Sequence, residues 1–331
     1  MGRQARAVKK VLALFLFLDA LGGGAAVAEA QQARPSSVGI VLQGGPYYAT
    51  IDGLRDGLRE LGLEEGKHFV LDIRDVKGDL KALEGAARSL EREKANLIYA
   101  ITTSAALAVK RATSDAPVVF CVGADPAVVS LVESFAKPGG RLTGVHFLSQ
   151  DLTAKRLEIL KEILPKLRRV VTFYNPSAPV AREGAKSGRE AGRHLGIEFV
   201  ERHVASVQEL QAGLRALRAG EADAYFLVAD GMVISQAQLI IDTARAKRLA
   251  TMFHDRGIVA KGALASYGVS YYACGRQSAK HVQRILAGTN PKDLPVEGVD
   301  RLELVLNLRT AQELGLTIPR LVLLRADKIF Q

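Results

Sequence analysis

Residues 97–126 read LIYAITTSAALAVKRATSDAPVVFCVGADP. Two short apolar runs, at 97–101 and 118–122, are rich in β-branched and aromatic residues, and the segment 104–113 between them repeats Ala, Leu and Val at helical spacing. A strand without polar residues is buried on both faces, and a connecting helix makes two such strands parallel. The stretch therefore predicts a strand–helix–strand unit of an α/β protein.

The same alternation continues in both directions along the 331-residue chain. Apolar runs predict further strands at residues 38–42, 69–73, 142–147, 170–174, 198–203, 224–228, 250–253, 263–269 and 302–307. Amphipathic segments predict further helices at residues 50–61, 80–94, 127–136, 152–164, 180–195, 207–219, 235–248 and 275–286. We therefore expect parallel sheets with helices on both faces, which is a doubly wound α/β fold.

The strand–helix series restarts in the middle of the chain. A strand at 38–42 followed by a helix is repeated by a strand at 170–174 followed by a helix, and the chain length suits two domains. We expect two doubly wound lobes joined near residues 143–150, with a ligand cleft between them. Lobe 1 is predicted to comprise residues 31–147 completed by 268–300, and lobe 2 to comprise residues 148–267 completed by part of 301–331.

Residues 1–30 have the order of a secretory signal peptide. Four basic residues precede the apolar run at 11–18, and Ala28-Glu29-Ala30 is a small-x-small cleavage site. An uncleaved anchor helix is the alternative, but Asp19 and the glycines from Gly22 interrupt the apolar stretch. No cysteine follows that could carry a lipid anchor. We expect export to the periplasm and cleavage after Ala28 or Ala30.

The charge of the chain bears on its possible binding partners, and its two cysteines bear on whether it contains a disulfide. The chain has 45 Lys and Arg against 35 Asp and Glu, a net charge of +10, which loss of residues 1–30 lowers by two to +8. Basic residues alternate with acidic ones, as in residues 91–94, which predicts a solvated surface and no nucleic-acid partner. Cys121 and Cys274 lie in unrelated stretches and are expected to be buried thiols, with a disulfide as the alternative.

Candidate ligand-binding residues follow from the expected sheets. Ligands of open parallel sheets bind beyond the carboxyl ends of the strands, beside helix N-termini with free N–H groups. Thr102, Thr103 and Ser104 place three hydroxyls where a helix should begin, which suits a carboxylate or another anion. A simple N-cap explains the same residues equally well.

Two acidic and two aromatic positions complete this set. Asp125 and Asp230 follow predicted strands and could hold a ligand ammonium or hydroxyl, although Asp also caps helices and turns. Tyr47 and Tyr48 follow the first strand and could stack on an apolar or aromatic ligand, with core packing as the alternative.

Sequence signatures of enzymes are absent from the chain. The histidines at 68, 146, 194, 203, 254 and 281 show no metal-ligand spacing, and the two cysteines form no CxxC pair. There is no GxGxxG, GxxxxGK[ST] or GxSxG motif. His254-Asp255 resembles part of a catalytic triad, but adjacent residues need not face each other. We expect no catalytic residue, no metal and no cofactor.

Motifs along the chain resemble those of a known family, the substrate-binding proteins of ABC transporters of the tryptophan/tyrosine-type group. The shared motifs are Asp125-Pro126, PGG at 138–140, YNP at 174–176, GALASYGV at 262–269, GRQ at 275–277, ILAG at 285–288, LPVE at 294–297 and AQELGLTIP at 311–319. They extend essentially over residues 38–329, and the ordered series is more specific than any single motif.

This resemblance implies a type I periplasmic-binding fold whose lobes close on a small solute, an amino acid or a related compound. Residues carried over by position are Thr102, Thr103, Ser104, Asp125, Asn175 and Asp230, and Tyr267 lies in a shared motif. The implied protein is a monomeric periplasmic receptor that delivers its solute to an ABC permease of the inner membrane. A periplasmic sensor with a signalling partner is the alternative, and an enzyme of the same fold would be recognised by turnover of the ligand.

The chain departs from the family pattern near the expected cleft. Residues 178–181 are APVA where the family often has Glu-Ala-Asn-Ser, and residues 229–232 are ADGM where it often has Thr-Asp-Asn-Thr. The opening turn at 44–48 is also unusual. These changes remove polar side chains, so the resemblance supports the binding fold more strongly than an amino-acid specificity.

Overall fold

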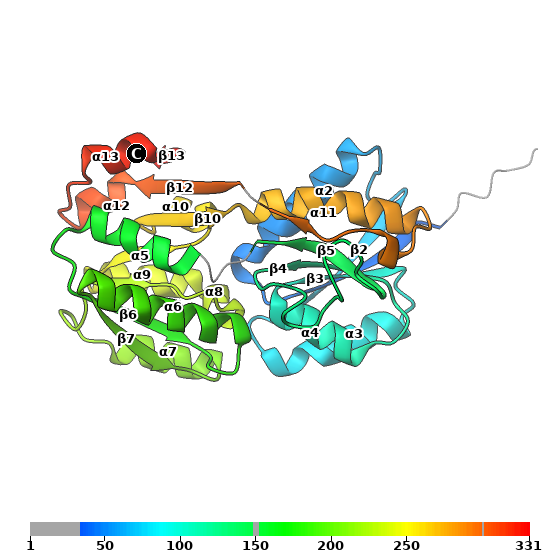
Figure 1. Ribbon diagram of the computed structural model, residues 1–331, viewed down its shortest axis with the longest axis horizontal. Helices are drawn as coiled ribbons and strands as arrows, with labels where there is room; N and C mark the ends of the chain where they lie inside the picture. The colour runs from blue at the N-terminus through cyan, green and yellow to red at the C-terminus, as the bar shows by residue number, and fades with distance from the viewer. Residues whose placement is uncertain (1–33, 148–151, 300) are drawn as a thin grey trace, which may run out of the picture. The chain divides into compact units, whose positions relative to one another are not determined.

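Two separate β-sheets organise the computed structural model, which describes residues 34–147, 152–299 and 301–331 (Figure 1). The predicted signal peptide and part of the predicted junction at 143–150 lie outside the described residues. The chain changes from one sheet to the other between 146 and 152, between 269 and 271, and between 298 and 302. The prediction of two α/β lobes is confirmed.

Lobe 1 contains a six-stranded sheet in which every pair is parallel. Its order is β11 (Glu297–Gly298), β5 (Leu142–His146), β4 (Val118–Val122), β3 (Leu97–Ile101), β1 (Ser36–Leu42) and β2 (Phe69–Asp75). Its helices are α2 (Tyr48–Glu60), α3 (Leu83–Arg92), α4 (Thr103–Ala112) and α11 (Tyr271–Leu286), with 3-10 turns η1 (Gly45–Tyr47), η2 (Leu80–Ala82) and η3 (Pro291–Asp293).

Both faces of this sheet are buried, as the unbroken apolar strands predict. In β3, Leu97, Tyr99 and Ile101 pack in the core formed with α2 and α11, whereas Ile98 and Ala100 pack in the core formed with α3 and α4. Successive side chains of a strand point to opposite faces, so each strand supplies both cores.

Helices α2 and α11 approach each other through glycines. A Cβ on Gly275 of α11 would lie 1.8 Å from the carbonyl oxygen of Thr50, and a Cβ on Gly53 of α2 would lie 1.9 Å from that of Tyr272. Only a residue without a side chain allows this backbone contact. The contact holds α11, which enters from lobe 2, firmly against lobe 1.

Lobe 2 contains a seven-stranded sheet with one antiparallel pair. Its order is β13 (Lys328–Phe330), β12 (Leu302–Asn307), β10 (Ala265–Val269), β9 (Ala250–Phe253), β8 (Ala224–Phe226), β6 (Arg169–Tyr174) and β7 (Glu198–His203). Its helices are α5 (Leu152–Ile163), α6 (Pro179–Leu195), α7 (Val207–Ala216), α8 (Gly231–Ser235), α9 (Ala237–Ala246), α10 (Arg256–Ala260), α12 (Leu308–Glu313) and α13 (Arg320–Arg325).

The eleven predicted strands are all present, but the expectation of wholly parallel sheets is wrong at β12. This strand returns from lobe 1 and reaches β10 without a crossover helix in lobe 2, so it runs antiparallel. The structure also contains elements that were not predicted as separate ones. They are two short strands, β11 and β13, and four short helices, α8, α10, α12 and α13.

The predicted helix at 127–136 is wrong. The chain makes one turn after Asp125 and stops at Ser130, which has a φ of 57°. The N–H of Leu131 then donates to the Pro126 oxygen at 2.7 Å and that of Ser130 to the Ala127 oxygen at 3.0 Å. This is a Schellman end, in which a left-handed residue terminates the helix. Leu131 is thereby buried in the core of lobe 1.

Candidate functional site

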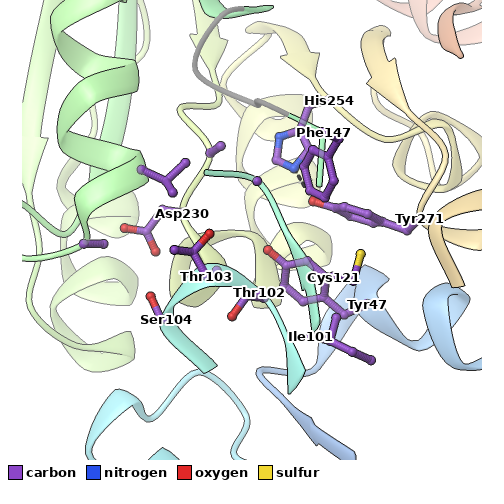
Figure 2. Close-up of a pocket in the computed structure, with 15 residues that line it drawn as sticks. Tyr47, Ile101, Thr102, Thr103, Ser104, Cys121, Phe147, Asp230, His254 and Tyr271 are labelled. Atoms are coloured by element: carbon purple, nitrogen blue, oxygen red, sulfur yellow. Dashed lines mark hydrogen bonds between the residues drawn. The ribbon is translucent and has the colours of Figure 1, made fainter. Parts of the chain in front are cut away.

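A cavity lies where the carboxyl ends of strands from both sheets meet (Figure 2). Its lining residues lie at or beyond the carboxyl ends of β1, β3, β4, β5, β8 and β9 or at the starts of α4, α6, α8 and α11: Tyr47, Ile101, Thr102, Thr103, Ser104, Cys121, Gly123, Phe147, Ala178, Val180, Ala229, Asp230, Gly231, His254 and Tyr271. The space within this lining is about 40 Å³. A benzene-sized ligand needs roughly 150 Å³, so a solute of amino-acid size requires the site to open.

The wall in lobe 1 is the start of α4. Thr102 is its N-cap, and the Thr102 hydroxyl accepts a hydrogen bond from the Ala105 N–H at 3.1 Å and donates to Oε1 of Gln43 at 2.6 Å. Thr102 has a φ of 103°, a costly conformation for a β-branched residue. The Thr103 hydroxyl accepts from the Ala124 N–H at 3.3 Å. The remaining first-turn N–H groups and the Ser104 hydroxyl can receive an anion.

The wall in lobe 2 contains Asp230, which is 3% exposed. Its Oδ1 accepts hydrogen bonds from the N–H groups of Met232 and Val233 at 2.9 and 3.1 Å, and its Oδ2 accepts one from the Asn175 N–H at 2.7 Å. Burial raises the pKa of the Asp230 carboxyl, and the three backbone hydrogen bonds oppose that rise. The carboxylate therefore caps α8 and holds the turn at Asn175, while lying at the cavity.

Four rings form a third wall. Tyr271 lies beside Tyr47, Phe147 and His254, with centroid separations of 4.9, 6.2 and 5.6 Å (Figure 2). The His254 Nε2 is hydrogen-bonded to the Tyr271 hydroxyl. Burial and the charge of Arg156 hold the pKa of His254 well below its usual range, and burial raises the pKa of both tyrosines. The wall is therefore aromatic and uncharged at neutral pH.

His254 and Asp255 do not form a catalytic pair. The Asp255 Oδ1 accepts from the Gly257 N–H at 2.8 Å, and its Oδ2 accepts from the Tyr271 N–H at 3.2 Å. The carboxylate thus joins the end of β9 in lobe 2 to the start of α11 in lobe 1. Burial raises its pKa to about 6. Its geometry is that of a structural cap.

The structure brings together five of the nine predicted site residues, namely Tyr47, Thr102, Thr103, Ser104 and Asp230. The other four lie outside the cavity lining: Tyr48 donates to Asp75 Oδ2, Asp125 caps the turn at 127–128, Asn175 closes a turn onto the Ser177 N–H, and Tyr267 packs beside the core of lobe 2.

Sequence reasoning missed most of the aromatic wall. Phe147 and His254 each come directly after a strand. The strand-end rule points to His254, which was considered only beside Asp255 as part of a triad, and it could also have selected Phe147. The sequence signal for Tyr271 was weaker. Ser270 before it is the N-cap of α11 and accepts from the Ala273 N–H, so this stretch indicates a helix start and does not by itself point to a ligand contact.

Other kinds of site find no support in the described ranges. No group of three or more His, Cys, Asp or Glu there is arranged to hold a metal ion. Cys121 and Cys274 are buried free thiols, the simpler of the two expectations. None of the helices in those ranges has the length and hydropathy that a membrane crossing requires.

Comparison with known proteins agrees with this architecture. A tyrosine-binding protein of Clostridioides difficile is 27% identical over 265 residues, which are 80% of this chain and 76% of that protein. A conserved domain protein of Vibrio cholerae is 31% identical with a TM-score of 0.81, covering 89% of this chain and 100% of that chain. The ligand-free, open structure of a substrate-binding protein with adhesive properties from Clostridium difficile is 26% identical with a TM-score of 0.59, covering 89% and 99%.

The family model described as ABC transporter substrate binding protein matches residues 37–330, nearly all of the described chain. A cavity between two α/β lobes, lined by rings and a helix start, is the arrangement of a solute receptor. The chain belongs to the family of ABC transporter substrate-binding proteins, which bind a solute and do not transform it.

Proposed function

We propose that the chain is a periplasmic receptor for an aromatic L-amino acid, tyrosine in the first instance, and delivers it to an ABC permease. The uncharged wall of Tyr47, Phe147, His254 and Tyr271 carries the proposal, because stacked rings favour a planar apolar side chain. The 27% identical tyrosine-binding protein supports the same ligand class.

The two ends of an amino acid fit the remaining walls. The α-carboxylate would lie at the start of α4, where N–H groups and the helix dipole favour negative charge. The α-ammonium would lie beside Asp230, whose Oδ2 accepts one backbone hydrogen bond and keeps a second acceptor site, whereas both sites of Oδ1 are used. Both contacts form together only when the lobes are closed, so the ligand would favour the closed state.

Opening is required for a solute to enter, because the space in this arrangement is only about 40 Å³ and is covered by both lobes. In the arrangement described, the lobes are closed. Gly45 of lobe 1 lies so near Ser235 of lobe 2 that a Cβ on Gly45 would be 2.8 Å from the Ser235 Cα. The low TM-score with an open, ligand-free relative agrees with a different lobe arrangement there. Bending would occur at the three crossovers between the sheets, the first of which includes part of 143–150.

Isothermal titration with L-tyrosine, L-phenylalanine and L-leucine tests the ligand class. We expect binding of the aromatic ligands and little or none of leucine, and a preference for leucine would overturn the aromatic assignment. Small-angle scattering should give a smaller radius of gyration at saturating tyrosine, and an unchanged curve would count against closure. Uptake of labelled tyrosine should fall in cells that lack the chain, whereas a sensor would leave uptake intact.

A further inference from the structure

Gln43 occupies a position between the lobes that the proposed function does not use. It directly follows β1 and has no exposed surface. Its side chain reaches Thr102 of lobe 1 on one side and Gly231 of lobe 2 on the other, and both of these residues line the cavity. Gln43 is therefore a buried polar side chain that lies directly behind two residues of the cavity lining, one from each lobe, and is not itself part of that lining.

Only half of its amide group has a hydrogen-bond partner. Oε1 accepts from the Thr102 hydroxyl at 2.6 Å, while Nε2 is buried without a partner among the described residues. The orientation of the amide is supported by Thr102, because its hydroxyl already accepts from the Ala105 N–H and has its own hydrogen left to donate. A separation of 2.6 Å is also typical of O–H···O and short for N–H···O. The free group of Gln43 is thus a donor.

A buried donor without a partner is rare and unfavourable, so an acceptor from outside the chain is the simplest complement. The start of α4 beside it independently favours an anion. We propose that Gln43 is a specificity-determining ligand residue, whose Nε2 donates a hydrogen bond to a carboxylate oxygen of the solute held at the start of α4. This inference rests on the proposed function and assigns the group that recognises the carboxylate.

Gly231 provides the space that this contact needs. A Cβ at position 231 would lie 2.3 Å from Oε1 of Gln43 and 2.9 Å from its Nε2. A side chain there would force the amide away from Thr102 and from the ligand. Because Gly231 starts α8 in lobe 2, the Gln43 amide can keep this position between the lobes only with glycine at 231, and a side chain there would require the amide to move.

The test compares L-tyrosine with L-tyrosinamide, in which a neutral carboxamide replaces the carboxylate. Gln43→Glu keeps the size of the side chain and the acceptor for Thr102 but replaces the donor by an anionic oxygen. We expect it to weaken L-tyrosine binding by roughly ten- to a hundredfold, and to shift the ratio of the two Kd values toward L-tyrosinamide, whose NH2 can donate to Glu. Gln43→Met should weaken L-tyrosine by about tenfold and reduce its advantage over L-tyrosinamide.

A control separates this role from a structural one. Gln277→Met makes the same change on α11, where Nε2 bonds Glu297 and the Gly298 oxygen outside the cavity. It should leave both Kd values at the wild-type level. Gly231→Ala should weaken L-tyrosine binding, and combining it with Gln43→Met should add little, because both changes remove one contact.

The outcomes separate the inference from the proposed function. If wild-type protein binds L-tyrosine and the Gln43 variants keep the wild-type Kd ratio, Gln43 does not recognise the carboxylate and the inference is overturned alone. A uniform loss of affinity for both ligands, accompanied by a lower melting temperature, would show a structural role and overturn it too. If the wild type binds none of the natural L-amino acids, the proposed ligand class and the inference both fall.

Discussion

Asp255 gives a pH dependence of stability whose sign and size follow from its surroundings. Its carboxyl is 3% exposed, and burial raises its pKa from 3.8 to about 6. Hydrogen bonds from the Tyr271 and Gly257 N–H groups and the charge of Arg256 oppose the rise, while the charge of Glu303 adds to it. The shift is about 2 pH units, which corresponds to roughly 3 kcal/mol.

The folded state therefore binds more protons than the unfolded state between about pH 4 and pH 6. The stabilisation that results from the raised pKa of Asp255 is fully present below the pKa of this carboxyl in the unfolded state. It is lost as the pH rises through the pKa of the carboxyl in the folded state. At pH 7 the buried carboxylate is charged in both states, and the cost of its burial lowers the free energy of unfolding by about 2 kcal/mol relative to pH 4, where part of the full effect is already lost.

Asp255→Asn removes this titration, because an amide is neutral over the whole range. Urea denaturation of both proteins at pH values from about 4 to 7 gives the free energies of unfolding. We expect the difference between wild type and variant to change by about 2 kcal/mol over this range, in the direction that favours wild type at low pH. Asp52→Asn is the matched control, since the Asp52 side chain is 64% exposed. A difference for Asp255→Asn that stays constant with pH would refute the reasoning.

Three further predictions concern the cap, the lobe contact and export. Asp230→Ala leaves three backbone N–H groups without their acceptor, so we expect a loss of about 2 kcal/mol in stability. We also expect calorimetry to show tyrosine binding weaker by roughly tenfold or more. Full affinity with a lowered melting temperature would exclude the ammonium contact. Gly275→Ala should cost about 3 kcal/mol or more in denaturant unfolding, because its methyl would meet the Thr50 oxygen, whereas Gly85→Ala on α3, with open space around it, should gain up to about 1 kcal/mol. The intact mass of the periplasmic protein should correspond to a chain that begins at Glu29 or Gln31, and retention of Met1 would contradict cleavage.

Local pattern in the chain predicts much of the fold. The sequence pattern predicts every strand of both sheets except the short β11 and β13. The central strands are apolar because both of their faces are covered, whereas the edge strands β2 and β7 carry charged side chains and are only partly buried. The strand-end rule selects Thr102 and Asp230, and the structure places both in the lining of one cavity. The failure at 127–136 has a local cause as well: the residue composition suits a helix, but Ser130 takes a left-handed conformation that buries Leu131.

The composition of the site depends on long-range packing. Tyr47, Phe147, His254 and Tyr271 come from four separate segments, and nothing in the local sequence of one segment indicates which ring it will meet. The same holds for Gln43 and Gly231, whose contact exists only because two lobes meet. Asp125 and Asn175 differ, because they follow strands yet accept hydrogen bonds from their own turns, which is a local use of the side chain.

The sequence by itself determined the class of fold, the restart of the strand–helix series and the family, since periodicity and ordered motifs are properties of the chain. The tertiary structure alone decided which strand ends share a cavity, that β12 runs antiparallel, and that an amide of lobe 1 faces a glycine of lobe 2. The physical reason is that hydrophobic periodicity selects a helix or a strand within a few residues, whereas a binding site is assembled from groups distant in sequence, whose positions are set by how the sheets and crossovers pack.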